Sequence, residues 1–311
     1  MGLHLPAERQ GKSSEPAAYS AIQKMSLAPR VVRLAARPPS PPWALAVSLV
    51  LSVLGVSARA EADECSGGEP WARLGASASN FAAPVPLTLT ALAVATPFGF
   101  VPTGLDQRLR VVAQRDLGGR PNLEPVSVWT PYVLGGGFVI GYGISVALGS
   151  CAGKRGFAPL LQAGALTFVG VSALKLAVGR RWPNGGRNPR APDRLDHPEG
   201  AHDFAPFQRG FASWPSGHTA LLFAGASAFR ASNPELGWVS WLGYPLALGV
   251  AGGMWFGDHH YASDIISGAL LGEAVGSSVG RSFSEALGVP GELALVPRTQ
   301  DGLALRWQGQ W

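Results

Sequence analysis

Three short segments of this chain carry side chains that bind anions or transfer protons. The segment "ALKLAVGRRWP" holds Lys175, followed by Arg180 and Arg181, at the end of an apolar run. A second segment, "PSGH", ends at His218 and leads directly into another apolar run. A polar turn in front of a helix leaves backbone N–H groups free to bind an anion, and the neighbouring histidine can move a proton. These residues therefore predict an anion site at the ends of two helices.

The third segment, "GDHHYASD", places Asp264 four residues after His260. An aspartate one helical turn after a histidine can hold the imidazole in one tautomer and stabilise its cation, as a histidine nucleophile requires. His218 could then protonate the leaving oxygen. The alternative, that the pair only marks a solvated helix start, is disfavoured by a row of small residues on the same helix face: Gly268, Gly272, Gly276 and Gly280.

The composition indicates the class of protein that holds these segments. Only 14% of the 311 residues are charged and 47% are hydrophobic, which is typical of a helical membrane protein. The arginines are spread over several loops, which disfavours a nucleic-acid surface. In an antiparallel bundle, helix ends that lie far apart in sequence can meet on one side, so the three segments can converge. We predict an all-α, multispan membrane bundle of about six helices, from the apolar stretches 84–101, 130–148, 158–178, 216–232, 238–256 and 262–280.

The flanking regions predict export and a small β element. Residues 1–60 combine a basic, disordered N-terminus with an apolar run and an Ala-Arg-Ala sequence, which indicates a signal peptide or an uncleaved anchor. Residues 61–129 are expected to form a periplasmic segment, the first apolar helix and an arginine-rich loop, and residues 130–282 the core. The tail, 283–311, has two short apolar runs around a Thr-Gln-Asp-Gly turn, which predicts a β-hairpin.

The order of the motifs, Lys…Gly-Arg…Pro, then Pro-Ser-Gly-His, then His-x-x-x-Asp, resembles the type 2 phosphatidic acid phosphatase (PAP2) superfamily over about residues 130–282. That superfamily also includes bacterial acid phosphatases and vanadium haloperoxidases. The resemblance implies that His260 attacks phosphorus and forms a phosphohistidine, that Asp264 orients it, and that His218 is the general acid for the leaving alcohol. It implies no metal or other cofactor, and it assigns the phosphoryl oxygens to Lys175, Ser216 and Gly217.

The sequence departs from the superfamily pattern at two positions. Trp182 and Met254 stand where the first and third motifs usually have a phosphate-binding arginine. Each charge-assisted contact is worth ~1.5–3 kcal/mol, so the loss of both would weaken transition-state binding by several orders of magnitude. Nearby arginines could supply the missing positive charge to the phosphate, or they could only be solvated, and the sequence favours neither alternative. The phosphate-binding replacements that we expect are Arg180 and Arg181, and the long polar loop adds Arg187, Arg190, Arg194 and Arg209.

Two functions fit these residues. The first is a membrane phosphatase that hydrolyses a lipid phosphate monoester or pyrophosphate, and the membrane setting favours a lipid over a soluble ester. The alternative is a catalytically impaired relative that binds lipid phosphates, which Trp182 and Met254 favour and the retained histidines disfavour. A vanadate-dependent peroxidase is disfavoured because it would not need a multispan bundle.

The resemblance also implies a location. We expect the cell (inner) membrane, with the active site facing the periplasm. The positive-inside rule argues for the opposite orientation. If all six stretches cross the membrane after an exported N-terminus, the site faces the cytoplasm, together with Arg108, Arg110, Arg115 and Arg120. The sequence predicts no partner beyond the lipid and the membrane, and it predicts no oligomeric state.

Overall fold

The structure, a computed structural model, describes residues 68–120, 122–183, 195, 201–208 and 210–286, and the backbone of 292–298 and 302–308. The chain divides into two compact units, residues 1–49 and 50–311, and every described residue belongs to the second. The predicted signal peptide or anchor, and most of the polar loop with its four arginines, lie outside the described residues.

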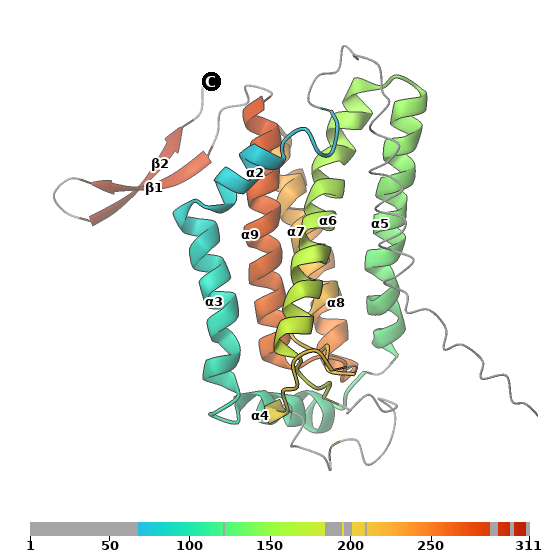
Figure 1. Ribbon diagram of the computed structural model, residues 1–311, viewed down its shortest axis with the longest axis vertical. Coiled ribbons are helices and arrows are strands. Elements are labelled where there is room, and N and C mark those ends of the chain that lie inside the picture. The colour runs from blue at the N-terminus through green and yellow to red at the C-terminus, as the bar shows by residue number, and fades with distance from the viewer. Residues whose placement is uncertain are drawn as a thin grey trace, which may run out of the picture. The chain divides into compact units, whose positions relative to one another are not determined.

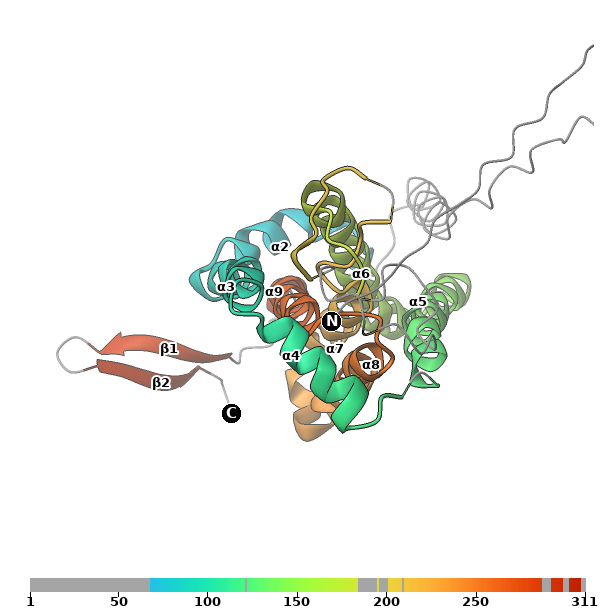
Figure 2. The ribbon, with the colours of Figure 1, turned by 90° about the horizontal axis from the view of Figure 1, so that it is seen from below.

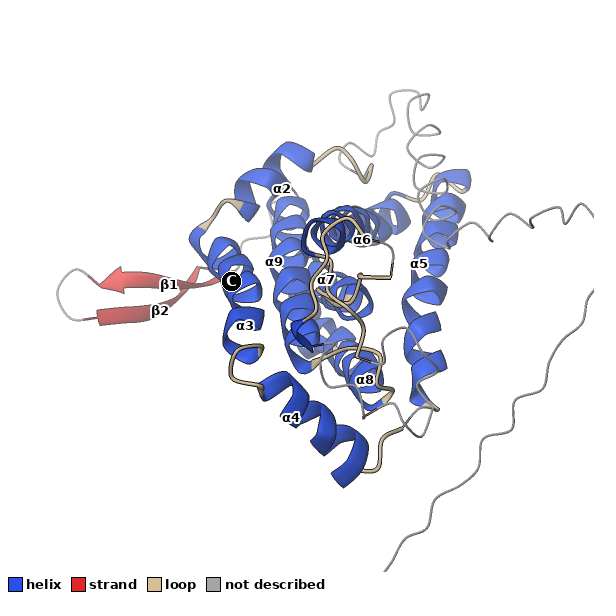
Figure 3. Cartoon of the chain, turned by 60° about the horizontal axis from the view of Figure 1, so that its bottom comes forward, coloured by secondary structure: helices blue, strands red, loops and turns tan. Residues whose placement is uncertain are grey.

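The described chain is mostly helical, as predicted (Figure 1, Figure 3). Each of the six apolar stretches overlaps one α-helix of at least 14 residues. The sequence analysis missed two short α-helices, Leu74–Phe81 and Leu105–Val111. It also missed a π-helical segment at Val112–Asp116 and a 3-10 segment at Pro234–Trp241. The α-helices are α2 (Leu74–Phe81), α3 (Pro84–Phe100), α4 (Leu105–Val111), α5 (Leu123–Ala147), α6 (Cys151–Val178), α7 (Gly217–Ser232), α8 (Gly243–Phe256) and α9 (Ala262–Ala286).

Local signals fix where α6 begins and ends. At its start, the Ser150 side chain accepts a hydrogen bond from the Gly153 N–H, which satisfies one of the free donors of the first turn. At its end, Gly179 adopts φ 61°, a left-handed conformation that glycine tolerates best. A Cβ at this position would lie 2.1 Å from the carbonyl oxygen of Ala205. The close approach brings the polar loop back against the end of α6.

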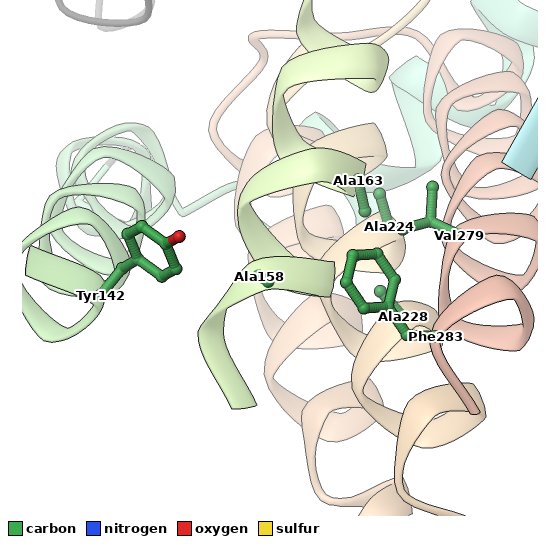
Figure 4. Packing of buried hydrophobic residues seen from close by; sticks show 7 residues of the cluster. All are labelled: Tyr142, Ala158, Ala163, Ala224, Ala228, Val279 and Phe283. Atoms are coloured by element: carbon green, nitrogen blue, oxygen red, sulfur yellow. The ribbon is translucent and has the colours of Figure 1, made fainter. Parts of the chain in front are cut away.

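The centre of the bundle is the contact between α7 and α9. The predicted glycine row lies along it: an added Cβ would lie 2.3 Å from the Ala220 oxygen at Gly272, and 2.3 Å from the Ala224 oxygen at Gly276. Such distances allow only glycine, so the prediction of close helix packing is confirmed. The buried core beside this contact is rich in alanine, whose small side chain lets helices pack closely. Figure 4 shows the cluster, which consists of Tyr142, Ala158, Ala163, Ala224, Ala228, Val279 and Phe283.

Membrane-spanning character is concentrated in part of the bundle. Two segments, Pro125–Ala147 within α5 and Cys151–Val178, are long and apolar enough to cross a bilayer. A third candidate is the pair α2 and α3, which pass the same criterion together but are bent by 69°. The prediction that all six stretches span the membrane therefore stays a prediction.

The C-terminal residues contribute two strands, β1 (Glu292–Arg298) and β2 (Gly302–Gln308), which pair antiparallel with Glu292 opposite Gln308. The side chains of both strands and the residues between them lie outside the described part of the chain. The predicted hairpin therefore stays a prediction, and we assign it no role.

Candidate active site

Three segments that are far apart in sequence meet at one end of the bundle, as the motif analysis predicted. They are the end of α6, the turn before α7 and the turn before α9 (Figure 1). Backbone hydrogen bonds join them, because Ser213 N–H donates to the Arg180 carbonyl at 2.9 Å and Ser216 N–H to the Asp264 carbonyl at 2.9 Å. Seen from this end, α4 lies across the bundle (Figure 2). The three motifs are thus held in one place by main chain.

His260, four residues before Asp264, is buried with one ring nitrogen facing polar groups. Its Nδ1 lies 3.4 Å from Oδ2 of Asp264 and 3.4 Å from Oγ of Ser213. The same Oδ2 accepts hydrogen bonds from Ser213 Oγ at 2.5 Å and from the Tyr261 N–H at 3.1 Å. Among the described residues, His260 Nε2 is buried and has no hydrogen-bond partner. Asp264 therefore faces Nδ1, and Nε2 is the nitrogen left for chemistry.

A second imidazole lies close to the first. The ring of His218, in the first turn of α7, is 6.5 Å from the ring of His260 and 6.1 Å from that of His259, measured between centroids. Its Nε2 is also buried without a partner among the described residues. Buried polar atoms are nearly always hydrogen-bonded, so each such exception asks for an explanation. A ligand that contacts both histidines would supply it.

Lys175 reaches the same end of the bundle from α6. Its Nζ donates hydrogen bonds to the carbonyl oxygens of Ala212 and Ser213, in the loop segment that precedes "PSGH". A Cβ on Gly217 would lie 3.6 Å from Lys175 Cε, so the lysine stem passes directly beside that glycine. The ammonium and the start of α7 are therefore brought together as predicted.

Ser216 is fully buried and caps α7. Its Oγ accepts from the Thr219 N–H at 3.5 Å and lies 3.0 Å from Thr219 Oγ1. This capping explains why a serine precedes the helix, since its side chain satisfies one of the free N–H groups of the first turn.

The two arginines expected to bind phosphate are engaged elsewhere. Arg180 is fully buried and donates to Asp264 Oδ1 at 2.6 Å and to Asp106 Oδ2 at 2.7 Å. It lies behind the aspartate that faces His260. Arg181 Nη1 is 2.9 Å from Asp203 Oδ2, and the Arg181 side chain is 42% exposed. Both positive charges are thus balanced by carboxylates within the described residues.

Two functional candidates on α4 were missed by sequence reasoning. Asp106 is fully buried and contacts Arg180, and Arg110 makes a two-point ion pair with Asp258 at 2.7 and 2.8 Å. In sequence these residues lie in a segment that reads as an arginine-rich loop. The only available signal was their spacing of four, which places both on one face of a helix.

The two positions that lack the superfamily's arginines are occupied by apolar side chains in contact with the histidine turn. The centroid of the Trp182 ring lies 4.8 Å from that of His259 and 4.9 Å from that of His260. Met254 is fully buried, and its carbonyl accepts the N–H of His259 at 3.0 Å. Lys175 Nζ also lies 5.3 Å from the Trp182 ring centroid. An aromatic ring therefore lies beside His260 where a guanidinium was expected.

Burial dominates the electrostatics of the histidine turn. It lowers the pKa of His260 to about 4, aided by the charges of Lys175 and Arg180, while Asp264 raises it in part through its hydrogen bond. Burial likewise lowers the pKa of His259 well below its ordinary value. Both rings are neutral at pH 7, and a neutral imidazole is the form that attacks phosphorus.

Comparison with known families agrees with this geometry. Residues 156–285 match the family profile described as PAP2 superfamily. The chain contains a PAP2 superfamily domain. It matches no curated protein and no solved structure. The PAP2 domain begins within α6 and includes Lys175, His218, His260 and Asp264, whereas α4, with Asp106 and Arg110, precedes it.

Proposed function

We propose that the PAP2 domain hydrolyses a phosphate monoester or a pyrophosphate of a membrane lipid through a phosphohistidine. PAP2 superfamily members are generally phosphatases. The observation that carries the proposal is the pair of buried Nε2 atoms of His218 and His260 in one cluster, with Asp264 on the other side of the His260 ring. Neither Nε2 atom has a hydrogen-bond partner in the described part of the chain. Two imidazoles in these positions can divide the reaction between a nucleophile and a proton donor.

In the first step, the lone pair of His260 Nε2 forms a bond to phosphorus while the bond from phosphorus to the leaving oxygen breaks. His218 donates a proton to that oxygen. Burial lowers the pKa of His218 to about 3, so the proton must be stabilised there by the negative charge of the bound phosphate. Asp264 stabilises the positive charge that develops on the His260 ring. In the second step, water attacks phosphorus, His218 takes its proton, and the N–P bond breaks to release phosphate and neutral His260.

The phosphoryl oxygens would be held by Lys175 and by the backbone N–H of Gly217, where a helix start attracts anions. The Ser216 N–H already donates to the Asp264 carbonyl, so Ser216 would contribute by capping α7. Arg181 would join Lys175 only after leaving Asp203, with which it is paired. We assign Arg180 to Asp264, because its guanidinium is already bound there. This division leaves fewer cations for phosphate than the superfamily pattern implies.

The proposed setting is the cell (inner) membrane, since two described helices are apolar enough to span a bilayer. We propose that the active site faces the periplasm, which rests on the resemblance to the superfamily. The arginines of the α4 segment lie at the same end of the bundle as the site and favour the cytoplasmic orientation instead. Accessibility labelling, described in the Discussion, distinguishes the two.

A specific observation also favours a second candidate function, a lipid-phosphate-binding protein without turnover. Trp182 packs on the rings of His259 and His260, where it adds no positive charge for phosphate. In this reading the domain would bind head groups through Lys175 and the start of α7 and would not form a phosphohistidine.

The decisive experiment is phosphate release by the purified full chain in detergent, with a chelator present, over a panel of lipid phosphates and pyrophosphates. A His260→Ala variant is measured beside it. Release by the wild type that this substitution abolishes supports the phosphatase. Retention of lipid phosphates on the wild type, with no release at high protein concentration, supports the binding protein.

A further inference from the structure

Asp106, on the short helix α4, is a buried carboxylate at the candidate active site that belongs to none of the three motifs. Its Oδ1 accepts the backbone N–H of Ser263 at 2.9 Å, and its Oδ2 accepts Ser263 Oγ at 2.6 Å and Arg180 at 2.7 Å. A buried carboxylate is costly unless it is paired and hydrogen-bonded, and here three donors satisfy it. Asp106 therefore ties α4 both to Arg180 and to the first turn of α9.

These contacts continue to the histidine. The Arg180 guanidinium bridges two carboxylates, since it also donates to Asp264 Oδ1 at 2.6 Å. Oδ2 of Asp264 in turn faces Nδ1 of His260. The path from α4 to the imidazole thus consists of three direct contacts between buried side chains: Asp106 to Arg180, Arg180 to Asp264, and Asp264 to His260.

We infer that Asp106 is a positioning residue for the reaction: by holding Arg180 and the start of α9, it keeps Asp264 aligned so that His260 presents a free Nε2. The inference rests on the proposed function, which makes His260 the nucleophile. Arg180 divides its charge between two anions. Without Asp106, the whole charge acts on Asp264, which then stabilises the positive imidazole less well. The rate of phosphoryl transfer should fall, while phosphate binding should not.

A second contact of α4 supports this role. Arg110 fixes Asp258, a non-glycine residue with φ 56° two positions before His260. Asp258, which Arg110 holds, and Ser263, which Asp106 holds, therefore lie on either side of His260 in sequence. Figure 2 shows α4 lying across this end of the bundle. The catalytic unit would accordingly extend beyond the matched residues 156–285.

The test is Asp106→Asn in the full chain, with Asp116→Asn as the matched control, because Asp116 is an exposed carboxylate ten residues along. The amide keeps the shape and loses the charge. Removal of an outer partner of a metal-ligating histidine typically costs on the order of 10- to 100-fold in activity. By analogy we expect kcat to fall by a factor in this range, with KM changed by less than about twofold. The control should match the wild type.

Two further readouts separate positioning from a general loss of structure. In a double-mutant cycle with Asp264→Asn, Asp106→Asn should cost little once Asp264 is gone. In protein with 15N-labelled histidine, NMR at pH 7 should show one tautomer of His260 in the wild type and a mixture in Asp106→Asn. If Asp106→Asn does not fold, Ser263→Ala probes the same contacts with a smaller change.

Unchanged kcat, or a loss that is additive with Asp264→Asn and leaves the tautomer unaltered, would overturn the inference. Failure of the proposed function looks different, because the wild type would then release no phosphate at all. The tautomer measurement needs no turnover and decides the role of Asp106 in that case as well.

Discussion

At the level of single residues, the chemistry depends on how His260 is surrounded. Asp264 and Ser213 face its Nδ1, and Trp182 covers one side of its ring. Arg110, Arg180 and Arg181, at this end of the bundle, are already paired with carboxylates, as Arg180 is with Asp106 and Asp264. Lys175 contacts carbonyl oxygens, which leaves its charge available to a phosphoryl group.

Trp182→Arg should strengthen phosphate binding, because it adds a guanidinium beside Lys175 and His260. One charge-assisted contact is worth ~1.5–3 kcal/mol, so the inhibition constant for inorganic phosphate should fall by about tenfold or more. Trp238→Arg is the control, since Trp238 is 75% exposed and belongs to the 3-10 segment between α7 and α8. An inhibition constant unchanged by Trp182→Arg would show that position 182 does not face the phosphate.

The pH dependence should report the buried nucleophile. His260 is active when neutral, and burial lowers its pKa to about 4. The mechanism also needs a proton on His218, whose pKa burial lowers to about 3. Since kcat/KM follows the free enzyme, it should rise as the pH falls from 7 towards 4, after correction for substrate ionisation, and should stop rising near pH 4, where His260 becomes protonated. A loss centred on the ordinary histidine value, about 6.5, would contradict the buried environment.

The pH dependence of kcat/KM has to be measured together with the stability of the fold, because acid also favours unfolding. The unfolded chain binds the His260 proton at about pH 6.5, whereas the folded chain binds it only near the lowered value, so acid between the two favours unfolding. Circular dichroism at each pH separates this unfolding from protonation of the nucleophile in the folded protein.

At the level of elements, the close contact of α7 with α9 brings the two histidine-bearing motifs together. His218 is the second residue of α7, and His260 lies two residues before α9. A shift of either helix would separate the two imidazoles. The glycines of α9 are therefore needed both for the close packing of α7 against α9 and for the proximity of the two imidazoles.

Gly272→Ala should be destabilising, because the new methyl group would lie 2.3 Å from the Ala220 carbonyl oxygen and 2.9 Å from the Ala224 nitrogen. Overpacking of this kind costs ~1–3 kcal/mol, which we expect as a lower unfolding midpoint in detergent. Gly225→Ala on α7 is the matched control, since nothing lies within 4 Å of its added Cβ. Equal midpoints for the two variants would contradict the packing described for α7 and α9.

At the level of the whole molecule, the two ends of the bundle should lie on opposite sides of a membrane. Phe207, 80% exposed, marks the site end, and Trp238, 75% exposed, the other end. If the site faces the periplasm, a membrane-impermeant maleimide should label Phe207→Cys in intact cells and should label Trp238→Cys only after lysis. The parent chain is the control, and Cys65 and Cys151 are replaced by serine in it and in both variants, so that only the introduced thiol can react.

The reverse pattern of labelling would place the site in the cytoplasm, as the arginines of the α4 segment favour. Labelling of both positions in intact cells would contradict a bundle that spans the membrane.

The sequence by itself determined the helical class, the six apolar stretches and the three motifs, because helix periodicity and motif spacing are local properties. It also predicted that a neighbouring helix packs closely on the glycine row of 262–280, since glycines four residues apart lie on one helix face whatever surrounds them. The structure identified that neighbour as α7. The tertiary structure decided which charges reach the site. Arg180 and Trp182 are two residues apart in the first motif, yet one lies behind Asp264 and the other against the nucleophile. Asp106 could not be found from sequence, because its partners are 74 and 157 residues away and only folding brings them within hydrogen-bonding distance.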